Sequence, residues 1–498
     1  MEPPVPSGTS ETSRTGTRIE MLERPHSVTR SSAIAMIGAI VSQCLRLVVV
    51  VYVARRFSSA QFGSFSFAMA VNAYVFVVAH FGLPLYGARA VAKAGRVSLR
   101  LVQAITCARA SLSVFGLAIA LGSLSLFPQV TKEELLVVTT FGLSNLALAG
   151  LYDWAFQGLG RLDISALLNT LWQGTWLILT MASVHEVWGI SGVGFALSVS
   201  ALIASALSYV WLKRSVWLEN EGEYQQSLIR ESWEIVKSGA HLGVGTMLIT
   251  VLTWTDTIVV RLLRGDHAVG VYAAGNRAAL ALSTLAGFYV LGALPYLSQA
   301  STAEPSRFVS LFQRTYDDLA LLFLPGALWT ISYAPEVIQL LFKQGDYIAG
   351  VSVFRIFQVV LVVNAISTLY GLGGLVAHHR DRTYQRVLLI STAAFVVLCP
   401  LLTIAWGIEG GALAVLATQI LCMVLFFFEA RGLAPARHGR ALLPPLALGA
   451  GAVFACRSLG LSLLPGVGML ILAYAILLVL RARSIRQEGI WRAVLQQG

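Results

Sequence analysis

The sequence predicts an all-α polytopic membrane protein, and three features of the chain indicate this class. Of its 498 residues, 56% are hydrophobic and 12% are charged, whereas a soluble protein carries about 25% charged residues. Apolar runs of about 20 residues, long enough to cross a bilayer as a helix, recur along most of the chain. Lysine and arginine gather in the polar segments between these runs. We therefore expect about 14 transmembrane helices rather than two or three soluble domains.

The expected helices coincide with the apolar runs. A helix rises about 1.5 Å per residue, so runs of this length cover the hydrocarbon core of about 30 Å. Pro325 interrupts the ninth run, and the thirteenth run is short. The expected spans are residues 32–54, 64–86, 101–124, 134–156, 164–184, 189–212, 238–261, 270–297, 316–334, 351–376, 385–405, 409–430, 442–459 and 462–480.

The order of runs and polar segments divides the chain into two lobes and a C-terminal pair of helices. Residues 1–30 are rich in Pro, Ser and Thr, a composition that predicts a disordered tail. Residues 31–213 and 238–430 each hold six expected helices. Residues 214–237, between the lobes, predict an amphipathic linker helix at the membrane surface. Residues 431–498 supply two additional helices and a basic tail.

The two lobes carry a weak internal repeat. The segment AQFGSFSFA, after the first expected helix, matches HAVGVYAAG, after the seventh. The match aligns Gly63 with Gly270 and Phe65 with Tyr272. Because the offset is an even number of helices, the repeats are parallel and related by an axis along the membrane normal.

The distribution of basic residues predicts the orientation in the membrane. With the N-terminus in the cytoplasm, about 25 lysines and arginines fall on the cytoplasmic side and about 7 on the other side. This bias predicts that both termini and the linker lie in the cytoplasm. The net charge of +11 is scattered in small clusters, which excludes a nucleic-acid-binding face. The seven basic residues expected on the non-cytoplasmic side are Arg55, Arg56, Lys132, Arg261, Arg264, Lys343 and Arg457.

Four arginines lie within or just inside apolar spans, at Arg46, Arg109, Arg277 and Arg355. A charged side chain at a helix centre costs about 2.5–3.5 kcal/mol, so such residues face the bundle interior or water. Arg46 follows Ser42 by one helical turn, which gives the first helix a polar stripe. We expect the four arginines to line a cationic, hydrated cavity between the lobes. The alternative is that they extend to lipid headgroups; Arg277 and Arg355 lie near helix ends and suit it better than the deeper Arg46 and Arg109.

Asp256 is an acid in the seventh expected helix. Two interpretations stand side by side. The carboxyl could bind a proton or a sodium ion as a counter-ion, or it could form a permanent salt bridge with Arg46 or Arg277. It lies on one helical face with Thr246, Thr250 and Thr253.

The segment DWAFQG resembles the D-W-x-[FY]-Q-G element of the polysaccharide and lipid-linked oligosaccharide flippases, within the multidrug/oligosaccharidyl-lipid/polysaccharide exporter superfamily. Asp153, Trp154, Gln157 and Gly158 match that element. The segments FGLPLYGARAVAK and GVYAAGNR are similar to other elements of the family, and the resemblance covers roughly residues 32–430. From the residues alone, we expect a turn at the membrane interface, with Trp154 at the level of the headgroups.

The resemblance implies that the chain flips a polyprenyl-diphosphate-linked oligosaccharide from the cytoplasmic to the outer leaflet by alternating access, without catalysis. It implies no cofactor and no metal. The expected partners are the lipid-linked glycan, membrane lipid and an H+ or Na+ counter-ion, together with a glycan polymerase or other export machinery. The cationic cavity suits a cargo that carries phosphates.

Two other functions remain as alternatives. A multidrug or cation antiporter of the same superfamily needs acids along its cavity, and only Asp256 fits that requirement. A membrane-embedded glycan polymerase or glycosyltransferase needs a sizeable extramembrane loop with convergent acids or a metal motif. The longest internal polar segment, residues 213–237, holds no such motif.

Overall fold

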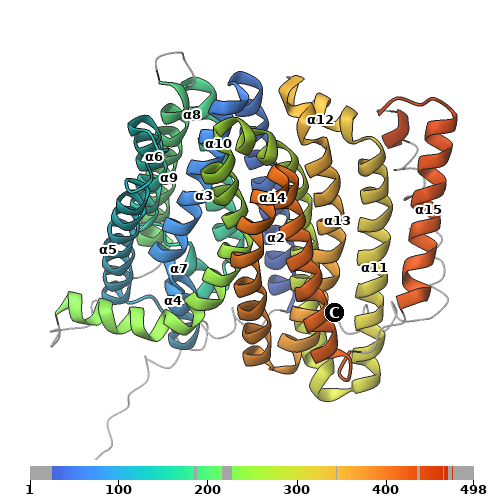
Figure 1. Ribbon diagram of the computed structural model, residues 1–498. Coiled ribbons are helices and arrows are strands. Elements are labelled where there is room, and N and C mark those ends of the chain that lie inside the picture. The colour runs from blue at the N-terminus through green and yellow to red at the C-terminus, as the bar shows by residue number, and fades with distance from the viewer. Residues whose placement is uncertain are drawn as a thin grey trace, which may run out of the picture.

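The computed structural model describes residues 25–183, 188–215, 227–343, 345–434, 438–463, 465–468, 471 and 474. All regular structure in this part of the chain is helical, as the sequence predicts (Figure 1). The first helix begins at Pro25, so residues 25–30 belong to a helix and not to the expected tail. Residues 1–24, most of the fourteenth expected span and the basic tail lie outside the described residues.

The first lobe consists of helices that pack mainly on one another. The helix α2 packs on α8, α6 packs on α9, and α3 packs on both α5 and α6. Two of these helices begin with a capping box, formed by Ser58 with Gln61 in α3 and by Thr131 with Glu134 in α6. The helices are α2 (Pro25–Arg56), α3 (Ser59–His80), α4 (Leu83–Ala94), α5 (Leu99–Leu124), α6 (Lys132–Leu148), α7 (Asp153–Gly158), α8 (Leu162–Ser183) and α9 (Gly189–Ser215).

The second lobe packs around the long helices α10, α13 and α14. The seventh and eighth expected spans are joined in α10, where Gly265 adopts a left-handed backbone (φ 86°) that bends the helix back. The expected break in α14 occurs at Trp406 and Gly407. The elements are α10 (Leu228–Ala303), α11 (Pro305–Ser332), α12 (Ala334–Phe342), η1 (Gly345–Gly350), α13 (Val351–Thr368), η2 (Leu369–Leu375), η3 (Val376–His378), α14 (Asp381–Ala430) and α15 (His438–Ser458).

Pro325 does not break the ninth expected helix, contrary to the sequence-based expectation. It lies inside α11, which is continuous from Pro305 to Ser332. The hydroxyl of Tyr474 accepts a hydrogen bond from the Gly326 amide (3.1 Å) and donates one to the Leu322 carbonyl (2.7 Å). A side chain from the C-terminal region therefore satisfies backbone groups beside the proline, where a helix loses regular hydrogen bonds.

The chain is a multi-pass membrane protein. In the described residues, seven helical segments are long and apolar enough to cross a membrane, or eight if α11 and α12, bent by 82°, count as one span. Both α10 and α14 contain two expected spans each. The number of about 14 transmembrane helices stays a prediction.

The molecule has two ends, which we name by helices that lie there (Figure 1). The α4 end holds α4 and α7, and the α12 end holds α12 and the turn between α2 and α3. The first turns of α10 lie across the α4 end beneath the first lobe. There Arg100 Nε donates a hydrogen bond to Glu231 (2.6 Å), and Ser232 Oγ donates one to the Ala104 carbonyl (3.0 Å). Ile229 and Trp233 are exposed on this segment, whereas Ile235 is buried. Its position at a membrane surface stays a prediction, and residues 216–226 lie outside the described part.

Candidate transport site between the lobes

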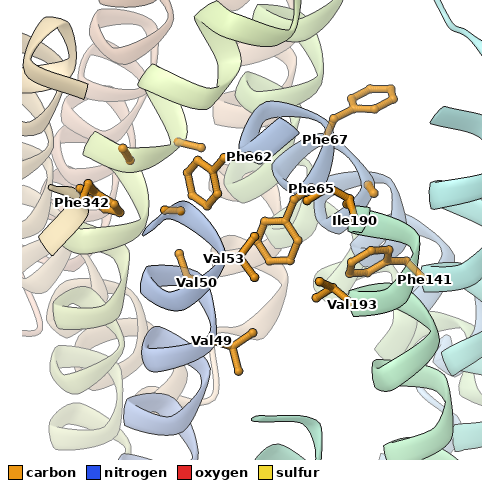
Figure 2. Close-up of a cluster of buried hydrophobic side chains, with 14 of the residues drawn as sticks. Val49, Val50, Val53, Phe62, Phe65, Phe67, Phe141, Ile190, Val193 and Phe342 are labelled. Carbon is orange, nitrogen blue, oxygen red and sulfur yellow. The ribbon is translucent and has the colours of Figure 1, made fainter. Parts of the chain in front are cut away.

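The lobes meet at the α12 end through a shared apolar core (Figure 2). Phe62 and Phe65 of α3 lie at its centre. The Phe62 ring packs on Phe342 of the second lobe, with centroids 6.3 Å apart, and the Phe65 ring packs on Phe141 of the first lobe at 5.8 Å. Removing this aromatic surface from water stabilises the contact between the lobes.

Two glycines make a reciprocal close contact at the same end. A side chain at Gly63 would overlap the Asp266 carbonyl oxygen, and a side chain at Gly270 would overlap the Ser59 carbonyl oxygen. The contact is symmetrical: Asp266 lies four positions before Gly270, and Ser59 lies four positions before Gly63. These are the two positions that the internal repeat aligns, so the repeat-related segments of α3 and α10 cross each other through their glycines.

Polar contacts close the α12 end further. Ser59 Oγ donates a hydrogen bond to Asp346 Oδ2 (3.0 Å) and lies 2.8 Å from His267 Nδ1. Because the serine hydroxyl has a single proton, Nδ1 of His267 is the donor in the second contact. Buried Arg261 of α10 donates to Glu134 of α6 (3.0 Å). At the α12 end, the lobes therefore contact each other through apolar packing, close backbone approach, hydrogen bonds and an ion pair.

Arg46 and Arg277, two of the four expected cavity cations, lie close enough for their charges to interact. Arg46 lies well inside α2, ten residues before its last residue. It is exposed on the surface of the protein. Arg277 is buried, with 8% of its surface exposed, so it does not extend to lipid headgroups. Its guanidinium lies over the Trp254 ring, 4.1 Å from the centroid. Its Nη1 and Nη2 atoms are buried without a hydrogen-bond partner.

Arg109 lies elsewhere, inside the first lobe. It is 1% exposed, and its Nη1 donates a hydrogen bond to the Leu151 carbonyl (2.8 Å) while Nη2 lies 2.5 Å from His80 Nε2. Because a guanidinium only donates, His80 Nε2 is the acceptor, and Nδ1 carries the proton that it donates to the Phe76 carbonyl (2.9 Å). Arg109 therefore joins α5 to the end of α3 and to the segment before α7.

Arg355 lies in the second turn of α13 and is exposed. Its Nε donates a hydrogen bond to the Ile331 carbonyl in the last turn of α11 (3.2 Å). A positive charge at the C-terminal end of a helix stabilises that helix. The structure thus brings Arg46 and Arg277 near each other and places Arg109 and Arg355 at separate positions.

Asp256 is buried and accepts hydrogen bonds from its own helix. Tyr272 Oη donates to Oδ2 (2.6 Å), Asn276 Nδ2 donates to the same oxygen (3.1 Å), and the Thr257 amide donates to Oδ1 (2.7 Å). The Thr257 hydroxyl is 3.3 Å from Oδ1. None of these partners is an arginine. The carboxylate instead joins the two halves of α10 across the Gly265 bend.

A cavity of about 290 Å³ opens beside Asp256 within the second lobe. Each water occupies about 30 Å³ in the liquid, so this space has room for an ion with water. Gln419 Nε2 donates a hydrogen bond to Asn364 Oδ1 (2.8 Å) in its wall. Carboxylate, amide and hydroxyl oxygens are the ligands that hard cations prefer. The polar lining residues are Thr253, Asp256, Asn276, Asn364 and Gln419.

The DWAFQG segment forms the separate short helix α7, because α6 ends at Leu148 and not at residue 156 as expected. Trp154 is fully buried, so its ring packs inside the protein and does not face lipid headgroups, and a side chain at Gly87 of α4 would overlap it. A side chain at Gly158 would overlap α4 as well. Small residues thus allow α4 and α7 to pack closely.

The other polar residues of this segment tie α7 to α8. Gln157 Nε2 donates a hydrogen bond to Ser165 Oγ (3.0 Å) and lies 3.4 Å from Asp153 Oδ2. Gly160 has a left-handed backbone (φ 73°) and makes the expected reversal into α8. The motif therefore builds a packed corner at the α4 end of the first lobe.

Trp254, Tyr272 and Asn276 are site residues that the sequence reasoning missed. Trp254 directly precedes Thr255 and Asp256, and the other two lie in GVYAAGNR, a segment already picked out for its resemblance. The missing signal was the bend at Gly265, which folds residues 272–276 back onto Asp256. A glycine between two apolar runs was the available clue.

Comparisons with known proteins agree with this architecture. The family described as "Polysaccharide biosynthesis protein" matches residues 28–301. The "Putative O-antigen transporter" of Escherichia coli (strain K12) is 22% identical over 388 residues, which cover 76% of this chain and 91% of that protein. These names are those of glycan biosynthesis and transport.

Solved structures show the same fold at low identity. "Lipid II flippase MurJ, inward closed conformation" aligns with a TM-score of 0.74 at 14% identity, covering 91% of this chain and 99% of that one. An inward-facing multidrug resistance MATE family transporter of the MOP superfamily aligns with a TM-score of 0.63 at 14% identity, covering 78% and 94%. Since the family match spans more than half of the sequence, the chain belongs to the polysaccharide biosynthesis protein family, and it shares the fold of these solved structures.

Proposed function

We propose that this protein flips a polyprenyl-diphosphate-linked oligosaccharide from the cytoplasmic to the outer leaflet of a bacterial inner membrane. The observation that carries the proposal is Arg277, a buried guanidinium whose Nη1 and Nη2 have no hydrogen-bond partner. A buried donor left unpaired costs about 1–3 kcal/mol, and more when it is charged. An anionic group that reaches the lobe interface would remove this cost by accepting both hydrogen bonds.

A diphosphate is the anion that suits this position best. Arginine recognises phosphate oxygens through two parallel N–H donors, and Arg46 supplies a second positive charge nearby. The same pair repels a cationic drug. Arg109 and Arg355, whose donors reach carbonyl oxygens, then have the role of holding helices together.

The counter-ion site belongs at Asp256. We propose that this carboxylate binds a proton or a sodium ion within the cavity that Asn276, Asn364 and Gln419 line. Asp256 and Arg277 attract each other electrostatically, so anionic cargo at Arg277 and a cation at Asp256 change each other's affinity. The same acid is the feature that favours the second candidate, a cation antiporter of this superfamily.

The contact between the lobes at the α12 end supports a direction for the proposed cycle. In our proposal the α4 end faces the cytoplasm, together with both termini and the linker, because most loop lysines and arginines lie there. Cargo enters from the α4 end while the α12 end is closed, and the lobes then rock about the site. A glycan polymerase or export machinery would receive the cargo at the outer surface.

Binding of a labelled polyprenyl diphosphate monosaccharide to the purified protein tests the proposal. Arg277→Ala and Arg46→Ala should each weaken binding about tenfold to hundredfold, the effect of losing charge-assisted hydrogen bonds worth about 1.5–3 kcal/mol. Lysine at position 277 should restore part of the affinity, since it keeps the charge and loses the two-pronged geometry. Arg355→Ala is the matched control and should bind normally. Wild-type affinity in Arg277→Ala would overturn the proposal.

A further inference from the structure

Three successive residues of α10 contact three different parts of the molecule. Trp254 packs under the guanidinium of Arg277, Thr255 contacts Tyr74 of the first lobe, and Asp256 holds the partners described above. Successive residues of an α-helix point about 100° apart because one turn takes 3.6 residues. One helical turn therefore touches the proposed cargo arginine, the opposite lobe and the proposed ion site.

The contact between Tyr74 and Thr255 is a hydrogen bond of known direction. The two hydroxyl oxygens are 2.5 Å apart. Thr255 Oγ1 also lies 2.7 Å from the Val251 carbonyl oxygen, to which it donates its single proton. Tyr74 is consequently the donor to Thr255.

Tyr74 belongs to α3, a helix that is hydrogen-bonded to α6 of the first lobe. Two residues before it on α3, Asn72 Oδ1 accepts a hydrogen bond from Asn145 Nδ2 of α6 (2.7 Å). Tyr74 also lies 11 positions after Gly63, which places it about 16 Å further along the helix at 1.5 Å per residue. The Tyr74 contact is therefore distinct from the glycine crossing that closes the α12 end.

An ion at Asp256 needs such a contact to influence the lobes. A ligand shifts a conformational equilibrium only if its free energy of binding differs between the two states. Thr257, Tyr272 and Asn276, the hydrogen-bond partners of Asp256, all belong to α10, so these bonds alone do not respond to the position of the first lobe. The hydrogen bond from Tyr74 crosses from α3 to Thr255, the residue next to Asp256, so a separation of the lobes at this point would break it.

We propose that Tyr74 is a positioning residue that couples the ion site at Asp256 to the separation of the lobes. This inference rests on the proposed function. While the lobes are closed near it, Tyr74 holds Thr255 and with it the orientation of Trp254 and Asp256 on either side. When the lobes separate at Tyr74, residues 254–256 lose this hydrogen bond. The geometry of Asp256 and the packing of Trp254 on Arg277 then change together.

The test compares Tyr74→Phe with Tyr347→Phe in vesicles of purified protein. Tyr347 Oη donates to the Ala54 carbonyl across the lobes at the α12 end (3.3 Å), so its variant removes an interlobe hydrogen bond far from Asp256. The quantity measured is the stimulation of transport of the labelled polyprenyl diphosphate monosaccharide by an imposed sodium or proton gradient. We expect Tyr74→Phe to transport the probe with its stimulation reduced to near unity, and Tyr347→Phe to keep the wild-type stimulation.

The outcomes separate this inference from the proposed function. Wild-type stimulation in Tyr74→Phe, or equal loss in both variants, would overturn the role of Tyr74. Thr255→Val, which removes the acceptor at similar volume, should reproduce the effect and replaces Tyr74→Phe if that variant does not fold. Transport by the wild type without any gradient dependence would also overturn the coupling. Failure of the wild type to move the probe would contradict the proposed function itself.

Discussion

At the scale of single residues, a buried charge has a role that its partners define. Arg109 and Arg277 look alike in the sequence, since both interrupt apolar runs. In the structure, both Nη atoms of Arg109 have acceptors, the Leu151 carbonyl and His80, and only its Nε lacks one. Both Nη atoms of Arg277 lack a partner. The first residue satisfies neighbouring acceptors, and in our proposal the second donates its hydrogen bonds to the cargo.

The role of Arg109 leads to a prediction about stability. Arg109→Ala should lower the free energy of unfolding, because the Leu151 carbonyl and His80 Nε2 lose their donor at a cost of about 1–3 kcal/mol each. Thermal unfolding of the purified protein in detergent measures the effect, with Arg355→Ala as the exposed control. If Arg109→Ala were stable but unable to bind the lipid-linked probe, Arg109 would belong to the cargo site as the sequence first suggested.

Asp256 provides a second residue-scale prediction. Asp256→Asn keeps an acceptor for Tyr272 and removes the charge that a proton or sodium ion neutralises. We expect this variant to bind the labelled probe and to lose the dependence of transport on a sodium or proton gradient. Transport measured in vesicles with and without the gradient gives the answer. A variant that responds to the gradient as strongly as the wild type would exclude Asp256 as the coupling site.

At the scale of helices, the glycine crossing of α3 and α10 sets how closely the lobes approach. Gly63 and Gly270 each lie directly against a backbone carbonyl of the other helix, an approach that any side chain would block. The repeat in the sequence identified this pair of positions. It did not reveal that they contact each other, because alignment compares segments without placing them in space.

Substitution at this crossing should hold the α12 end apart. The readout is disulfide formation between Ser59→Cys and His267→Cys, which replace side chains in contact, in a protein without its native cysteines. Gly270→Ala should reduce the yield of this disulfide several-fold. Gly245→Ala, on the same helix with open space around it, should leave the yield unchanged. Equal yields for the two variants would show that the crossing does not control closure.

At the scale of the whole molecule, hydropathy predicted the helices, and their boundaries depended on tertiary contacts. Each expected span up to residues 442–459 overlaps a helix in the described part of the chain. The continuous α11 depends on Tyr474, more than 140 residues away along the chain. The buried position of Trp154 depends on the space left by Gly87. Periodicity cannot supply such contacts, because they join segments that are distant in sequence.

The arginines expected on the outer side show that tertiary contacts also affect where charged residues occur. These residues depart from the positive-inside pattern. Buried Arg261 pairs with Glu134, and three others donate to backbone carbonyls. Arg55 donates to the Leu341 carbonyl (2.7 Å), Arg264 to the Thr403 carbonyl (3.0 Å), and Arg457 to the Ser332 carbonyl. These carbonyls lie near helix C-termini or a helix break, where a positive charge is stabilising.

Flipping of a lipid-linked glycan across a bilayer is the activity that defines the proposed function, and it can be measured directly. Vesicles would contain the purified protein and a polyprenyl diphosphate monosaccharide with a fluorescent label, and a membrane-impermeant quencher would report the leaflet. We predict that the wild type moves the labelled lipid between leaflets much faster than protein-free vesicles do, and that Arg277→Ala slows this at least about tenfold, the equivalent of about 1.4 kcal/mol. Absence of lipid movement, with uptake of a cationic dye instead, would contradict the account and identify a cation antiporter.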